Sequence, residues 1–181
     1  MNRTALLLLA LASIAAACTS APGADGGAEA PPAAIDVEAL DLPYAAAPAP
    51  GLVTAGQLSP EQMTALAAAG ATHFVSLRLA EENGSGWEEA FAADKGYAFT
   101  RIPVAGAAGI EDGNARTLHD LVESTEGTVV VYCGSSNRVG TLLGLGRARF
   151  GGLSNEEALE FARLAGMTRM APVLEKALAG E

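Results

Sequence analysis

The segment from Thr128 to Gly140 constrains the fold of this chain more strongly than any other. Its first five residues form an apolar strand pattern that ends at Cys133, four small residues follow, and Arg138 stands just before a helical pattern that begins at Val139. A short loop that leads into a helix turns several backbone N–H groups inward, and the helix dipole adds partial positive charge. The segment therefore predicts an anion-binding loop next to a nucleophilic cysteine thiolate.

A cysteine at the end of a strand is often only a small buried core residue. Core packing alone does not require four small residues and an arginine before the next helix, so the pattern favours an anion site. Arg138 would bind the anion through its planar guanidinium fork. The loop that would surround the anion consists of Gly134, Ser135, Ser136 and Asn137.

Strand and helix patterns alternate along the chain after residue 51. Strand patterns occupy residues 52–55, 71–79, 97–104 and 128–133, and helical patterns occupy residues 60–69, 87–95, 113–124, 139–150, 154–165 and 170–179. This alternation predicts an α/β fold, a parallel doubly wound sheet of about four strands flanked by helices. Ligands of such sheets bind at the carboxyl ends of the strands, where Arg78 and Cys133 both fall. Arg78 is therefore a candidate substrate ligand, with pairing to Glu82 as the alternative.

The first 17 residues have the pattern of a secretory signal. Arg3 precedes an apolar run over residues 5–12, and three alanines stand directly before Cys18, in a segment too short for a stable membrane span. The junction resembles the lipobox of bacterial lipoproteins. That resemblance implies a lipid anchor on Cys18 and, because Thr19 is not the retention aspartate, an outer-membrane location facing the periplasm. The alternative is ordinary secretion with an unmodified Cys18.

Residues 18–50 are rich in Ala, Pro and Gly and carry acidic but no basic side chains. Such a segment buries little apolar surface and predicts a disordered acidic tether, within which residues 35–44 have enough apolar side chains to dock weakly. Residues 51–181 are then long enough for one domain with a single core.

Composition excludes several functions. The formal net charge of −10 argues against a nucleic-acid partner. His73 and His119 are the only histidines and have no cysteine or carboxylate at ligand spacing, so no metal site is predicted. The glycines at 144 and 146 lie in a helical pattern and do not follow a strand, so no dinucleotide cofactor is predicted. If Cys18 carries lipid, Cys133 has no disulfide partner within the chain.

Four motifs point to a known family. They are Thr54–Pro60, Val75–Arg78 followed by Glu81 or Glu82, Ile102–Val104, and Tyr132–Gly140, of which only the last is specific. With these motifs the domain from Gly51 to Leu178 resembles the bacterial beta-lactamase-hydrolase-like phosphatase-like domain family, which is related to dual-specificity protein tyrosine phosphatases. The resemblance implies a cysteine-dependent phosphatase in which Cys133 is the nucleophile, Arg138 binds the anion and Gly134–Asn137 provide the cradle backbone.

The chain departs from the wider tyrosine-phosphatase pattern in ways that affect the chemistry. Four residues separate Cys133 from Arg138 instead of five, a spacing also seen in rhodanese-like sulfurtransferases. Val139 replaces the usual serine or threonine. Alanine and glycine occupy residues 105–108, where that pattern places an aspartate general acid, so Asp112 is the nearest substitute, although an acid at a helix start is also explained by the dipole.

Three functions therefore remain open from the sequence. The first is a phosphatase that acts on phosphate monoesters or a related oxyanion. The second is a rhodanese-like sulfurtransferase, in which Cys133 would carry a persulfide and no general acid would be needed. The third is a noncatalytic lipoprotein that binds an anion or a partner, because fold and motif do not by themselves define function.

Overall fold

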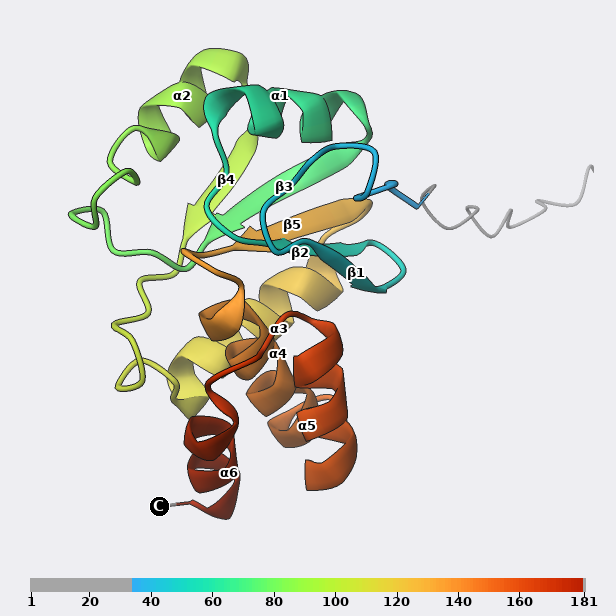
Figure 1. Ribbon diagram of the computed structural model, residues 1–181, viewed down its shortest axis with the longest axis vertical. Helices are drawn as coiled ribbons and strands as arrows, with labels where there is room; N and C mark the ends of the chain where they lie inside the picture. Colours follow the sequence, from blue (N-terminus) through green and yellow to red (C-terminus); the bar gives the residue numbers. More distant parts are fainter. Residues whose placement is uncertain (1–33, 181) are drawn as a thin grey trace, which may run out of the picture.

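A computed structural model of the protein describes residues 34–180 (Figure 1). Its centre is a five-stranded sheet, in the order β1 (Ala46–Ala49), β2 (Leu52–Ala55), β5 (Thr128–Tyr132), β3 (Ala71–Ser76), β4 (Ala98–Arg101). Four strands run parallel, and β1 pairs with β2 in the antiparallel direction at the edge. The sheet confirms the predicted α/β class, with one strand more than expected.

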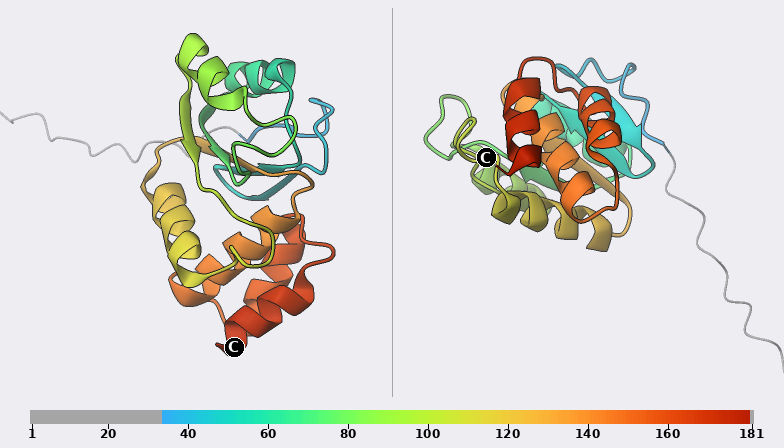
Figure 2. Two further views of the ribbon diagram at one scale, coloured as in Figure 1. Left: turned by 90° about the vertical axis from the view of Figure 1, so that its left-hand side faces the viewer. Right: turned by 90° about the horizontal axis from the view of Figure 1, so that it is seen from below.

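Helices cover both faces of the sheet (Figures 1 and 2). One face carries α1 (Pro60–Ala68) and α2 (Glu88–Lys95), and the other carries α3 (Asp112–Ser124), α4 (Asn137–Arg149), α5 (Asn155–Leu164) and α6 (Ala171–Ala179). On this second face α4 contacts both α5 and α6, α5 also contacts β1, and α6 lies farther from the strands (Figure 1). The predicted helices are all present.

Strand β5 lies in the middle of the sheet and joins the two cores. All five of its residues are buried. Because successive side chains point to opposite faces, Val130 and Tyr132 pack toward α1, whereas Val129 and Val131 pack toward the helices of the other face. A continuous apolar run is the pattern expected of a parallel strand that is covered on both sides.

Two helices begin where the sequence predicts them, each at a capping box. The Ser59 hydroxyl accepts a hydrogen bond from the Gln62 backbone N–H at 3.2 Å, and the Gln62 side chain accepts one from the Ser59 N–H at 2.9 Å. Ser154 and Glu157 make the same pair of bonds at the start of α5. Each box satisfies two N–H groups that the helix itself leaves without acceptors.

The segment 34–50 is folded on the domain, where the sequence predicts a disordered tether with weak docking of residues 35–44 only. Strand β1 belongs to the sheet, Ile35 is buried, and apolar side chains between residues 37 and 45 pack on the core that contains α1. The apolar residues of this segment bury enough surface to hold it on the domain. The predicted signal and Cys18 lie outside the described residues, and no helix within residues 34–180 is long and apolar enough to cross a membrane.

Glycines in α4 allow neighbouring helices to approach closely. A Cβ atom added to Gly140 would lie 2.6 Å from the Met167 backbone nitrogen, and one added to Gly144 would lie 2.8 Å from the Ala162 Cβ. A Cβ on Gly146 would meet the Ala115 carbonyl at 3.2 Å. Gly140 and Gly144 therefore face α5 and the loop after it, and Gly146 faces α3.

Candidate active site

Cys133 follows β5 at the carboxyl end of the parallel strands. Its residue is 1% exposed, and its backbone N–H donates to the Ala55 carbonyl at 3.3 Å. It borders an open cavity of about 290 Å³, which is lined by Gly106, Cys133, Gly134, Ser135, Asn137, Arg138, Arg169 and Met170. The cavity therefore lies where ligands of α/β sheets are expected.

The loop after Cys133 has the geometry of an anion cradle. Ser136 adopts left-handed φ of 58° directly before the helical Asn137, and this sequence of conformations turns successive N–H groups toward one side. Within the described chain, the backbone N–H groups of Gly134, Ser135 and Asn137 donate to no protein acceptor. The Ser136 hydroxyl donates to the Ala165 carbonyl at 3.2 Å and helps hold this uncommon backbone conformation in place.

Arg138 is held over the cradle by Glu82. Its Nη1 donates to Glu82 Oε1 at 2.6 Å and to the Val104 carbonyl at 2.8 Å, and its Nη2 donates to Glu82 Oε2 at 2.8 Å. These hydrogen bonds lower the pKa of Glu82 to about 2 and raise the pKa of Arg138. The Arg138 Nε donates to no acceptor within residues 34–180, so one edge of the guanidinium remains available to an anion.

Arg78 pairs with Glu82, which is the alternative to substrate binding that the sequence leaves open. Its Nε pairs with Glu82 Oε2 at 3.0 Å, its Nη2 donates to the Asn83 carbonyl at 2.9 Å, and its Nη1 donates to the Gln57 side chain. Arg78 is not among the residues that line the cavity. It therefore positions Glu82, which in turn positions Arg138.

A buried polar network behind Arg78 extends beyond what the sequence analysis identifies. Gln57 Nε2 donates to Glu88 Oε1 at 2.8 Å, and Arg101 Nη2 lies 3.0 Å from Glu88 Oε2. Arg101 also donates to the Arg78 carbonyl at 3.0 Å. Burial and the nearby Glu88 carboxylate raise the pKa of Tyr132. The structure ends β4 at Arg101, whereas the sequence pattern continues this strand to residue 104, so no local signal marks Arg101.

Asn137 uses its side chain to hold the opposite wall of the cavity. Its Oδ1 accepts from the backbone N–H groups of Thr168 at 3.0 Å and Arg169 at 2.8 Å. Its Nδ2 donates to the Ser135 carbonyl at 3.3 Å. Asn137 thus connects the cradle to the loop between α5 and α6, a role that its place in the motif does not reveal.

Asp112 is not brought to the cavity. Its carboxylate pairs with Arg149 Nε at 3.3 Å, near the end of α4 opposite to Arg138. At 1.5 Å per helical residue, Arg138 and Arg149 lie about 16 Å apart along the axis. No aspartate or glutamate of the described residues lines the cavity. The geometry therefore does not support Asp112 as the general acid.

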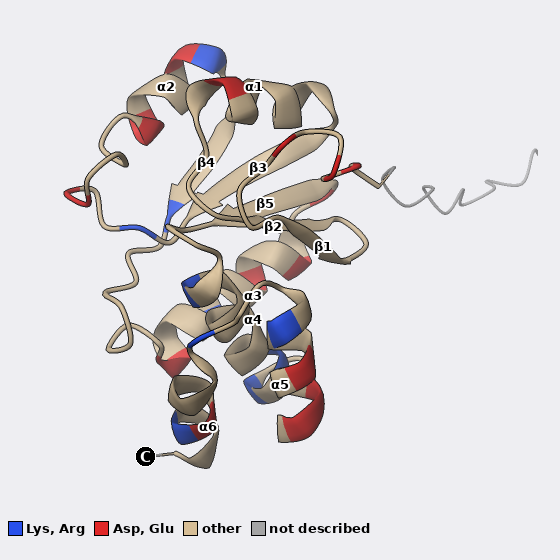
Figure 3. Ribbon diagram, in the orientation of Figure 1, with Lys and Arg blue, Asp and Glu red and all other residues tan. Residues whose placement is uncertain are grey.

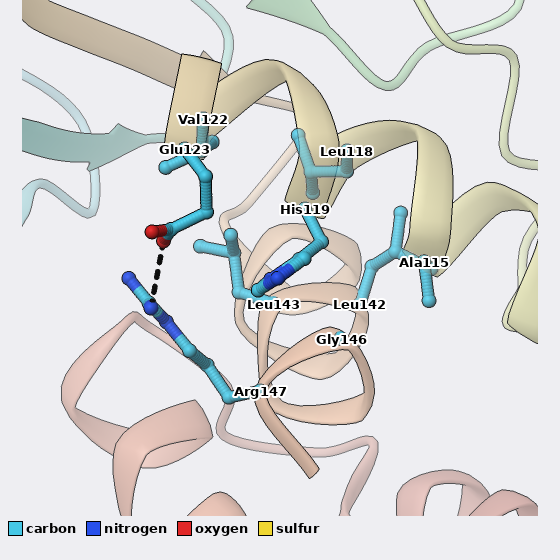
Figure 4. A pocket seen from close by; sticks show the side chains of 9 residues that line it. All are labelled: Ala115, Leu118, His119, Val122, Glu123, Leu142, Leu143, Gly146 and Arg147. Carbon is cyan, nitrogen blue, oxygen red and sulfur yellow. Dashed lines mark ion pairs between the residues drawn. The ribbon is translucent and has the colours of Figure 1, made fainter. Parts of the chain in front are cut away.

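A second pocket lies between α3 and α4, with His119 and Leu142 among its lining residues and the Glu123–Arg147 ion pair at its edge (Figure 4). It contains no nucleophile or anion cradle, so it is not a candidate active site. Among residues 34–180 no group of three histidine, cysteine or acidic side chains is placed to hold a metal ion. Basic and acidic segments are interspersed over the helices (Figure 3). The positive charge at the cradle therefore comes from groups at the site itself, such as Arg138, and not from a basic face of the protein.

No protein-family model and no curated protein sequence matches this chain. Solved structures do resemble it. A candidate phosphatase from Neisseria meningitidis is 22% identical, with a TM-score of 0.62, over 74% of this chain and 98% of that one. TpbA from P. aeruginosa is 16% identical, with a TM-score of 0.60, over 77% and 85% of the two chains. The catalytic domain of the PP-IP phosphatase SIW14 from S. cerevisiae is 13% identical, with a TM-score of 0.56, over 75% and 84%.

At these identities the likeness establishes the fold. The chain has the tyrosine-phosphatase-like α/β fold of these structures, as the resemblance in its motifs implies. What the fold is used for has to be argued from the site itself.

Proposed function

We propose that this protein is a cysteine-dependent hydrolase of phosphate monoesters. The observation that carries the proposal is the cavity that Cys133 shares with the Arg138 guanidinium and with loop N–H groups that have no protein acceptor. A phosphoryl group needs such an arrangement, namely a nucleophile on one side and preorganised donors around its oxygens. A further support is that a cysteine-to-serine variant of TpbA, a protein of the same fold, has been solved in complex with phosphotyrosine.

The proposed reaction has two displacement steps. The Cys133 thiolate attacks phosphorus, the bond from phosphorus to the ester oxygen breaks, and that oxygen leaves with the electron pair and takes a proton from water. Water then attacks the phosphocysteine, which releases inorganic phosphate and regenerates the thiolate. Arg138 and the loop N–H groups bind the non-bridging oxygens throughout.

The residues that line the cavity limit which leaving groups can react well. Because no carboxylate from residues 34–180 lines the cavity, none of the described side chains there is placed to protonate a strongly basic alkoxide. Esters whose leaving group is weakly basic should therefore react best. We expect aryl phosphates to be turned over faster than alkyl phosphates.

A rhodanese-like sulfurtransferase is the second candidate. The four-residue spacing between Cys133 and Arg138 and the absence of a carboxylate from the cavity lining favour it. In that reaction the Cys133 thiolate takes the outer sulfur of thiosulfate and sulfite leaves. Cyanide then takes the sulfur from the persulfide as thiocyanate, which restores the thiolate.

One experiment separates these candidates. The purified protein is assayed with an aryl phosphate and, side by side, with thiosulfate plus cyanide. Turnover of the aryl phosphate alone, lost in Cys133→Ser and kept in Cys18→Ser, is the expected result. Turnover of thiosulfate alone would overturn the phosphatase proposal. Turnover of neither, with retained binding of phosphate, would favour a noncatalytic anion-binding protein.

We also propose that the protein is anchored in the bacterial envelope, on the periplasmic side of the outer membrane. The support is the sequence at Ala15–Cys18, where small residues precede a cysteine after an apolar run. Intact mass and detergent partitioning test the lipid at Cys18. A Cys18→Ser variant that stays with the membrane as the natural protein does would contradict the proposal.

A further inference from the structure

Arg169 is a second arginine on the cavity that contains Cys133 and Arg138. It lies in the loop between α5 and α6, two residues before the start of α6, and it is exposed. Within the described chain its side chain neither pairs with an acidic group nor donates a hydrogen bond. Its charge therefore faces the cavity and solvent without a counter-ion from residues 34–180.

The other arginines of residues 34–180 are nearly all engaged. Those paired with acidic side chains are Arg78, Arg101, Arg138, Arg147 and Arg149. Arg116 lies 3.9 Å over the ring of Phe150. Only Arg163 resembles Arg169 in having neither kind of partner, and it lines a surface depression together with Glu156 and Glu160. In a chain with net charge −10, an unneutralised arginine at the anion cradle is a specific feature.

The backbone of Arg169 is fixed relative to the cradle. Asn137 Oδ1 accepts from the Arg169 N–H at 2.8 Å, and from the Thr168 hydroxyl at 3.2 Å. Asn137 also borders the cavity and immediately precedes Arg138. The two arginines thus stand on one cavity, and a hydrogen-bonded side chain connects their backbones.

Arg138 and the loop N–H groups are already sufficient donors for one phosphoryl group. The charge of Arg169 is therefore not needed for that phosphoryl group and can bind a different anion. Resting on the proposed function, we infer that Arg169 binds a second anionic group of the substrate, so that the site prefers phosphate compounds whose leaving group itself carries a carboxylate or a further phosphate. A guanidinium suits both anions, because its planar fork matches their paired oxygens.

Binding to a Cys133→Ser protein tests the inference without turnover. Three probes are titrated by calorimetry: phenyl phosphate, 4-carboxyphenyl phosphate and inorganic diphosphate. Arg169→Ala is made in the same background, and Arg163→Ala is the matched control because it removes an equal charge from a side chain that does not line the cavity. Arg169→Gln, which keeps most of the side-chain length, repeats the test if the alanine variant does not fold.

We expect Arg169→Ala to weaken binding of at least one doubly anionic probe by about five- to tenfold and of phenyl phosphate by less than about twofold. Loss for the carboxylate probe alone, or for diphosphate alone, identifies which second anion the site takes. Arg163→Ala should leave all three affinities unchanged. Equal losses for the three probes, or none, would overturn the inference while leaving the proposed function intact. Failure of Cys133→Ser to bind any probe would overturn the proposed function, and the inference with it.

Discussion

Helix α4 carries an arginine–carboxylate pair near each of its ends, and the two pairs differ in almost every physical respect. Arg138 and Glu82 meet through two hydrogen bonds of 2.6 and 2.8 Å, with side chains 14% and 26% exposed. Arg149 and Asp112 meet at 3.3 Å, with side chains 30% and 64% exposed. Exposed pairs contribute little to stability, whereas a half-buried bidentate pair fixes the direction of a guanidinium. An arginine–carboxylate pair therefore positions a guanidinium at the amino end of α4, whereas the pair at the carboxyl end is only a solvated surface contact.

The helix dipole sharpens this difference. At the carboxyl end of α4, Arg149 neutralises the negative pole. At the amino end, Arg138 adds positive charge to the positive pole, an arrangement that is unfavourable unless an anion is close. Glu82 provides that anion from the side, and the cradle has room for another. The amino end of α4 is thus the place where this fold concentrates positive charge for a ligand.

Replacing Arg138 by lysine should produce the largest effect on the proposed chemistry. The ammonium keeps the charge but cannot hold Glu82 and an oxyanion with one planar fork. We expect the affinity for vanadate and kcat/KM for an aryl phosphate to fall about 100-fold, the range seen when one preorganised donor is lost from an oxyanion site. Arg149→Lys is the control and should change neither quantity. Equal vanadate affinity of Arg138→Lys and the natural protein would show that Arg138 is not a ligand.

Packing near the same end of α4 should be the next most sensitive feature. In Gly140→Ala the new Cβ would lie 2.6 Å from the Met167 backbone nitrogen, so α5 and the loop that carries Arg169 would have to move. Overpacking of this kind costs about 1–3 kcal/mol. Denaturant unfolding measures the loss of unfolding free energy. The control is Gly113→Ala in α3, where the nearest contact is 3.7 Å, and a similar loss there would contradict the packing argument.

The sequence is sufficient to predict the elements whose signals are local. The apolar run before Cys133 predicts β5, the helical patterns at 60–69 and 154–165 predict α1 and α5, and Cys133 with Arg138 predicts the cradle. Strand β1 is missed because its Ala-Ala-Pro-Ala sequence has no strand propensity of its own. It forms by pairing with β2 at an edge of the sheet, where a proline is tolerated.

The parts of the site that escape prediction depend on distance along the chain. Glu82 meets Arg138 across 56 residues, and Asn137 meets Arg169 across 32. No local periodicity reports such contacts. Asp112 is a candidate from the sequence for the opposite reason, because it is near the expected acid position along the chain. In the structure its carboxylate pairs with Arg149, near the end of α4 that is far from Arg138. Asp112 is close to the expected acid position along the chain but far from Arg138 in space, because the two ends of α4 are about 20 Å apart.

The pairing of Glu82 should be visible in the pH dependence of stability. Its pKa falls from 4.5 to about 2 in the folded protein, chiefly because Arg138 donates to it. A folded pKa below the unfolded value means that the carboxylate stabilises the fold above pH 4.5 and that this contribution is lost as the pH falls toward 2. In Glu82→Gln the unfolding free energy should therefore depend less steeply on pH in that window. Glu81→Gln, at a neighbouring exposed residue, is the control. An unchanged slope in Glu82→Gln would contradict the pairing.

The smallest effect is expected for the exposed Asp112–Arg149 pair at the carboxyl end of α4. In Asp112→Asn the exposed pair with Arg149 is weakened, which should change the unfolding free energy by less than about 1 kcal/mol. The profile of kcat/KM against pH with an aryl phosphate should stay within about twofold of the natural one, whereas loss of a general acid costs about 10²–10⁴-fold. A loss in that range would place Asp112 in the chemistry after all. It would also mean that α3 moves toward the cradle when substrate binds, since the carboxylate otherwise lies more than two helical turns away from Arg138.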